Sequence, residues 1–122
     1  MELINIETNV EEHLISAKVL KVGNDILIIV TGGKSHIGAV GVTIPTDSIV
    51  TGKLTAYTST ITLPSHKEDI IVKLIGERVS KETGKNVVVI AGIHFDNLSQ
   101  DKIGKIVENC SELSDKIIKK IG

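Results

Sequence analysis

The hydrophobic period of the chain changes once, near Pro64, and this change restricts the fold more than any other feature. Residues 2–63 alternate apolar with polar side chains or form short apolar runs, which is typical of β-strands. From 70 to 79 and from 103 to 118, apolar residues instead recur at helical spacing. The sequence therefore predicts five strands followed by a helix, a strand and a helix. The expected strands are residues 2–8, 13–22, 25–31, 37–44, 53–63 and 86–93.

Isoleucine and valine dominate the apolar residues of this 122-residue chain, with 20 Ile and 13 Val against 9 Leu, which favours a sheet. We expect one α+β domain over residues 1–122. Its simplest architecture is a mainly antiparallel six-stranded sheet, in which the first five strands form a meander and both helices cover one face. The strand at 86–93 should run parallel to the fifth. The apolar run 25–31 (DILIIVT) predicts burial on both faces of the sheet.

Composition and charge argue against several classes of protein. The 14 basic and 15 acidic residues nearly cancel, and Tyr57 and Phe95 are the only large aromatic side chains, so we expect no nucleic-acid binding. A lone Cys110 allows neither an internal disulfide nor a cysteine zinc site. No apolar run reaches the length of a membrane span, and the chain start lacks an apolar signal core. These features predict a cytoplasmic protein that does not enter a membrane.

A polar, glycine-rich segment, TGGKSH (31–36), interrupts the apolar strands of the first half. In the predicted topology the third, fifth and sixth strands end at the same edge of the sheet. This places His36, His66 and His94 together on one edge, which we call the rim. The residues expected to bind a ligand or a partner there are Gly32, Gly33, Lys34, Ser35, His36, His66, Lys67, Glu68, His94, Asp96 and Asn97.

Both predicted helices begin at this rim. Ser65 and Glu68 match a capping box for the first helix, and Asn97 with Gln100 offers a capping pair for the second. Helix starts bring unpaired N–H groups and partial positive charge to the rim. His13, at the start of the second strand, is expected on the surface away from it.

A nucleotide-binding loop and a metal site are two interpretations of the rim. The P-loop pattern needs a glycine five residues before Gly33, where Ile28 stands, and a helix after it, where a strand is expected, so we reject it. A metal site could use imidazoles, but no short ligand spacing occurs in the sequence. The weak candidates for such ligands are His36, His66 and His94, with Asp96 as a further oxygen ligand.

An anion pocket and a purely structural role are the other two interpretations. Helix starts, glycine amides and the side chains of Lys34 or Lys67 could hold a phosphate group, although nearby carboxylates oppose a net attraction. Alternatively, the glycines only form a tight turn and the polar residues only cap helices. The metal, anion and structural interpretations all stay open on the sequence alone.

Three segments, HIGAV (36–40), LPSHKED (63–69) and AGIHFDN (91–97), together resemble the LpdD-like family. Its members include the small D subunit that accompanies prenylated-flavin-dependent, UbiD-type decarboxylases of gallate and other hydroxyaryl acids. The family is similar in fold to the small, dimeric proteasome assembly chaperones. The residues on which the family pattern falls are Gly33, His36, Ile37, Gly38, Pro64, His66, Lys67, Glu68, Gly92, His94, Asp96 and Asn97.

The resemblance implies a non-catalytic accessory or chaperone-like protein. It would assist the handling of prenylated FMN, or of another phosphate-bearing cofactor, and the maturation of a decarboxylase. The alternatives are a protein-binding module like the proteasome assembly chaperones, or a small enzyme that binds metal or phosphate at the histidine rim. The expected larger partner is accordingly a decarboxylase or a proteasome subunit.

A homodimer is also expected. The domain is small and rich in Ile and Val, and threonines line one side of the strand at 53–63. Such a strand suits a sheet edge that pairs with another chain.

Overall fold

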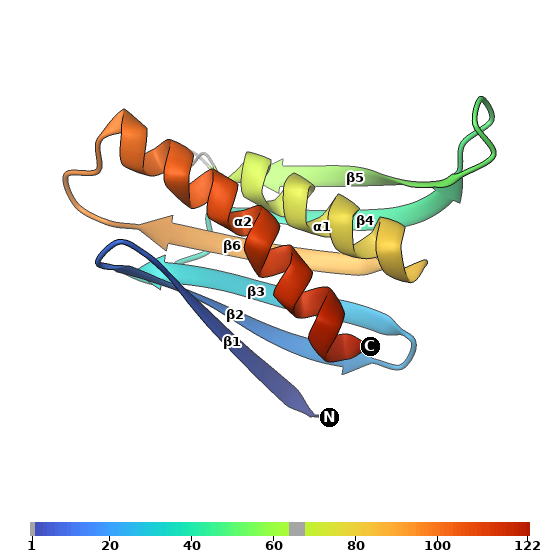
Figure 1. The fold of residues 1–122 in the computed structure, drawn as a ribbon, viewed down its shortest axis with the longest axis horizontal. Helices are drawn as coiled ribbons and strands as arrows, with labels where there is room; N and C mark the ends of the chain where they lie inside the picture. The colour runs from blue at the N-terminus through green and yellow to red at the C-terminus, as the bar shows by residue number, and fades with distance from the viewer. Residues whose placement is uncertain (1, 64–67) are drawn as a thin grey trace.

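The computed structural model describes residues 2–63 and 68–122 and confirms the predicted order of elements (Figure 1). Five strands precede the first helix, and a sixth strand separates the two helices. The strands are β1 (Leu3–Val10), β2 (His13–Val22), β3 (Asp25–Gly33), β4 (Ala39–Asp47), β5 (Leu54–Thr62) and β6 (Val87–His94), and the helices are α1 (Asp69–Thr83) and α2 (Gln100–Ile121). Neither helix is long and apolar enough to cross a membrane, judged over the described residues.

The strand order, β1-β2-β3-β6-β4-β5, differs from the predicted meander. β6 lies between β3 and β4, pairs parallel with β3 and antiparallel with β4, and has no pairing with β5. The sheet is therefore mixed, and the β3–β4 pairing of the predicted meander is wrong. β3 and β6 are the two strands that are apolar on both sides, and such strands belong at the centre of a sheet.

The relative directions of the strands nevertheless agree with the prediction. β3 and β6 are parallel, β4 is antiparallel to β6, and β5 is antiparallel to β4. β3, β5 and β6 consequently all end at the same edge of the sheet, as predicted for the rim. β5 is an edge strand, which was also expected.

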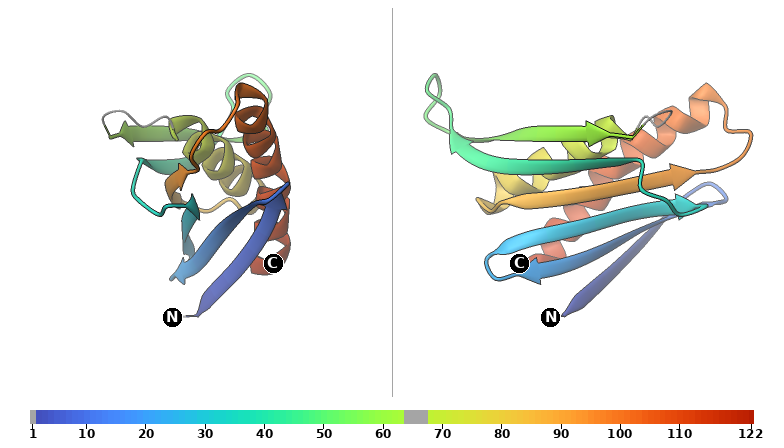
Figure 2. Two further views of the ribbon diagram at one scale, coloured as in Figure 1. Left: turned by 90° about the vertical axis from the view of Figure 1, so that its left-hand side faces the viewer. Right: turned by 180° about the vertical axis from the view of Figure 1, so that it is seen from behind.

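Both helices cover the same face of the sheet, as predicted (Figures 1 and 2). α1 packs on β4, β5 and β6, and α2 packs against α1 and β1. Ile75 and Val79 of α1 and Leu113 and Ile117 of α2 are fully buried, so the two apolar helix stripes meet the sheet in one core. The fold therefore brings the starts of both helices to the edge at which β6 ends.

Candidate functional site

His36 and Glu68 form a hydrogen-bonded pair at the rim. His36 lies in the segment between β3 and β4, and its Nε2 is 3.0 Å from Oε1 of Glu68, the residue just before α1. The other ring nitrogen, Nδ1, is 3.1 Å from the carbonyl oxygen of Lys34. A neutral imidazole has one N–H, so both contacts are hydrogen bonds only when the pair carries a second proton, on the ring or on the carboxyl group. The pair therefore connects the segment after β3 to the start of α1.

Two glycines make room for this pair. A Cβ at Gly38 would overlap the carboxylate of Glu68, and a Cβ at Gly92 would overlap the backbone carbonyl of His36. The segment thus crosses directly over β6, where the N–H of Gly38 donates to the carbonyl of Ala91 at 2.9 Å. Close approach of backbone to backbone is possible there because glycine has no side chain.

His94 and Asp96 extend the rim beyond the end of β6. The ring of His94 meets that of His36 edge-on, with the ring centroids 6.3 Å apart. His94 Nε2 is 3.2 Å from Oδ1 of Asp96. Both side chains are exposed, so they can contact a ligand or a partner directly. The structure therefore brings together four of the predicted residues, His36, Glu68, His94 and Asp96.

The other predicted residues are divided between the rim and the undescribed segment. Gly32 and Gly33 end β3 beside the ring of Phe95, and Lys34 and Ser35 follow them as exposed residues. His66 and Lys67, with Pro64 and Ser65, lie outside the described residues. The described ranges hold no group of three or more His, Cys, Asp or Glu side chains placed to bind a metal.

Both predicted helix caps need correction. α1 begins at Asp69 with Glu68 as the N-cap residue, so Glu68 is not at the third helical position that a capping box with Ser65 requires. The cap of α2 is Ser99, whose Oγ accepts from the backbone N–H of Lys102 at 3.2 Å. Asn97 instead adopts a left-handed backbone conformation (φ 60°), which asparagine tolerates better than most residues.

His13 also lies at the rim, contrary to the prediction. Its ring centroid is 4.3 Å from that of Phe95, and its Nε2 is 3.3 Å from Oε1 of Glu12. The sequence contained the signal for this position. The tight turn at Gly23 and Asn24 makes β2 and β3 antiparallel, so β2 must begin where β3 ends.

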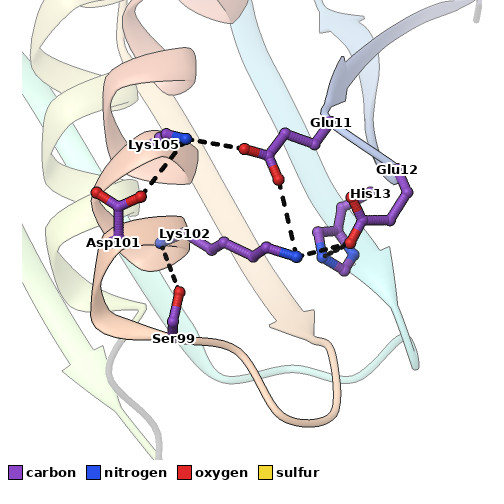
Figure 3. A network of polar contacts seen from close by, with 7 residues as sticks. All are labelled: Glu11, Glu12, His13, Ser99, Asp101, Lys102 and Lys105. Atoms are coloured by element: carbon purple, nitrogen blue, oxygen red, sulfur yellow. Dashed lines mark hydrogen bonds and ion pairs between the residues drawn. The ribbon is translucent and has the colours of Figure 1, made fainter.

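Ion pairs connect the start of α2 with the β1–β2 turn (Figure 3). Lys102 Nζ is 2.7 Å from Glu12 Oε1, and Lys105 Nζ is 2.8 Å from Glu11 Oε1 and 3.5 Å from Asp101 Oδ2. The hydrogen bonds from Lys105 and Lys102 lower the pKa of Glu11 and of Glu12, respectively, and the same bonds raise the pKa of both lysines. These contacts connect the start of α2 to the β1–β2 turn.

A largely apolar cavity of about 430 Å³ opens beside the rim, between the starts of α1 and α2. Its lining residues are Glu68, Ile70, Ile71, Ile93, His94, Phe95, Leu98, Ile103, Ile106 and Val107. Only Glu68 and His94 among them are polar, so the cavity combines apolar walls with polar groups on one side. Sequence reasoning missed the apolar lining. The signal was the placing of isoleucines, Ile70 and Ile103, in the first helical turns, where polar residues are usual.

The fold defines a class, a small α+β domain in which two helices cover one face of a mixed six-stranded sheet. The chain is similar to one from the crystal structure of a novel chaperone complex for yeast 20S proteasome assembly, with a TM-score of 0.53 and 13% sequence identity. The match covers 97% of this chain and 99% of that one, which shows a shared fold.

The sequence match is more specific. Residues 9–122 match the family model described as the prenylated flavin chaperone LpdD-like domain. The chain is also 31% identical over 103 residues to Protein LpdD of Lactiplantibacillus plantarum, covering 80% of this chain and 69% of that protein. The chain therefore belongs to the LpdD-like family of prenylated flavin chaperones, and its role is that of a chaperone-like accessory protein.

Proposed function

We propose that this chaperone-like protein binds a prenylated flavin at the rim and delivers it to a decarboxylase. The observation that carries the proposal is the apolar cavity of about 430 Å³ beside the His36–Glu68 pair. A prenylated flavin joins an apolar ring system and an added prenyl group to polar ring atoms and a phosphate. A cavity with apolar walls and polar groups on one side suits such a ligand.

In this proposal, different residues of the cavity contact different parts of the cofactor. Ile70, Phe95 and Ile103 offer apolar surface to the ring system. Glu68 and His94 face the same cavity and can exchange hydrogen bonds with polar ring atoms. The cofactor supplies the electron sink that non-oxidative decarboxylation needs, and the chaperone holds and shields it.

Delivery to an enzyme is the step that separates a chaperone from a catalyst. We expect the purified chain, mixed with prenylated FMN and a hydroxyaryl acid, to release no carbon dioxide. Addition of the chain and cofactor to an apo-decarboxylase should raise the fraction of enzyme loaded, compared with cofactor alone. Turnover by the isolated chain, or loading that the chain leaves unchanged, would contradict the proposal.

We further propose that the chain acts as a homodimer. β5 is an edge strand, as the dimer interpretation of the sequence assumed. A larger and more apolar surface lies on the face of the sheet away from the helices, and it supports the same proposal more strongly.

A further inference from the structure

The helices leave one face of the sheet uncovered (Figure 2, right), and the outward side chains of its central strands are apolar. Leu27 and Ile29 of β3 lie in register with Val88 and Ile90 of β6 and point to this face. Val42 and Val40 of β4 continue the same two rows. No element of the described ranges packs on these side chains, so they are only partly buried within one chain.

The apolar surface continues to the edge of the sheet. Ile44 is 56% exposed, and Tyr57 and Ile61 of β5 are 70% and 73% exposed. Away from the strand ends, the outward residues of β3, β6, β4 and β5 are apolar or carry a hydroxyl group. Charge appears on the opposite flank, where Glu7 of β1 and Lys18 of β2 point to the same face. We call this surface the open face.

The strand sequences indicate that the open face is covered in the working protein. An antiparallel sheet with one solvated face normally alternates apolar and polar residues, whereas DILIIV and VVVIA are apolar at every position after Asp25. The two helices account for one side only. Exposed apolar patches larger than a few hundred Å² are uncommon on monomers and mark interaction sites.

We propose that a second copy of this chain covers the open face, with the two sheets packed face to face. This assigns a surface to the homodimer proposed above and rests on that proposal, but it does not depend on flavin binding. The open face spans all six strands; at about 4.8 Å between strands and about six residues in each, it measures roughly 550 Å², and two such faces reach the roughly 1,000 Å² that specific interfaces need. Twisted sheets pack well on one another at about 10 Å.

The charge pattern favours a second copy over a different partner. The centre of the open face carries no charge, so two identical faces do not repel each other there. The flank carries one acid, Glu7, and one base, Lys18, and such a flank is complementary to itself under a two-fold axis. A second copy is also always present at the concentration of the chain. A partner that comes and goes would leave the patch exposed between encounters.

The test is the mass of the purified chain in solution, measured by light scattering without flavin or decarboxylase. The wild type should show twice the chain mass of 13.1 kDa. Val42→Lys and Tyr57→Lys should each show the mass of one chain, because a charge at the centre of the interface is desolvated without a partner. Both side chains are at least 43% exposed in one chain, and circular dichroism should report an unchanged fold.

Ile49→Lys is the matched control, because Ile49 is fully exposed in the β4–β5 connection, outside the open face. It should retain the dimer mass. A monomeric wild type at micromolar concentration would overturn the proposal, as would folded Val42→Lys and Tyr57→Lys variants that remain dimers. Dimeric variants would indicate a dimer that pairs through the β5 edge instead. They would not affect the flavin proposal.

Discussion

Glu68 is a buried carboxylate of the rim. Its side chain is buried, with 6% of the residue exposed, and it joins the loop after β3 to the start of α1 through His36. The sequence predicted that Glu68 and His36 would share a rim, because strand direction alone determines that. Their direct contact could not be predicted, since it depends on a loop that passes over Gly92 and Gly38.

Removing this carboxylate should destabilise the protein. We expect Glu68→Ala to lower the free energy of unfolding by about 1–3 kcal/mol, because the buried carboxylate and its hydrogen bond with His36 are lost. Urea denaturation measures the change. Asp96→Ala is the control, since Asp96 is 89% exposed at the side chain and should change stability by less than about 0.5 kcal/mol. Equal effects of the two variants would mean that the His36–Glu68 bond is not formed in solution.

Gly92 should tolerate no side chain. Gly92→Ala forces a methyl group into the carbonyl oxygen of His36, and backbone must shift, so we expect a loss of about 1–3 kcal/mol or more. Gly104→Ala in α2 is a matched control, because the new Cβ meets no described atom within 4 Å. Alanine is favoured over glycine in a helix, so this variant should gain up to about 1 kcal/mol. A neutral Gly92→Ala would show that the loop does not cross β6 as described.

At the scale of elements, the insertion of β6 between β3 and β4 is what the sequence did not determine. Alternation decides which side chains face the core, and it is satisfied equally by a β3–β4 or a β3–β6 pairing. The connections between the strands decide which of the two pairings forms. β4, β5 and α1 precede β6 in the chain, and β6 occupies a central place that needs apolar side chains on both faces. Element order and the common face of the helices were predictable because each depends on local periodicity.

α1 lies close to β4 because a small residue faces the sheet. A Cβ at Gly76 would overlap Oγ1 of Thr43, which itself shares a 2.7 Å hydrogen bond with Oγ1 of Thr58. Gly76→Ala should therefore lower stability by about 1–3 kcal/mol, despite the better helix propensity of alanine. The same urea series, again with Gly104→Ala as the control, measures this. A Gly76→Ala variant more stable than the wild type would show that α1 can move away from β4 without a loss of stability.

The ion pairs between α2 and the β1–β2 turn should make a pH-dependent contribution. The pKa of Glu11 and of Glu12 lies below the ordinary value of 4.5, so the stabilisation is present above 4.5 and is lost as the pH falls through the lowered pKa. We expect a Lys102→Gln, Lys105→Gln variant to be less stable than the wild type at neutral pH. The two should converge in acid, below the lowered pKa of Glu11 and of Glu12, where both carboxylates are protonated.

Comparing urea midpoints at the two pH values checks this prediction. Glu11, Glu12 and Lys105 are exposed and Lys102 is half-buried, so the difference should be small and should shrink in about 1 M salt. A difference that persists unchanged at low pH would mean that the lysine side chains contribute by packing and not by charge.

At the scale of the whole molecule, the cavity and the open face lie on opposite sides of the sheet. The cavity is lined by the starts of both helices, and the open face is the one that the helices leave uncovered (Figures 1 and 2). A face-to-face dimer would thus leave both cavities accessible for a cofactor. Mutations on the open face should change mass without changing flavin affinity, and mutations in the cavity should do the reverse.

The most direct test of the central proposal is calorimetric titration of the purified chain with prenylated FMN. We predict that the wild type binds it, and that Ile103→Glu weakens binding at least tenfold, because a carboxylate then stands in the apolar wall of the cavity. Ile103 is 43% exposed, so the fold should survive, and Ile49→Glu should bind as the wild type does. Equal affinity of all three proteins, or no binding by the wild type, would contradict the account.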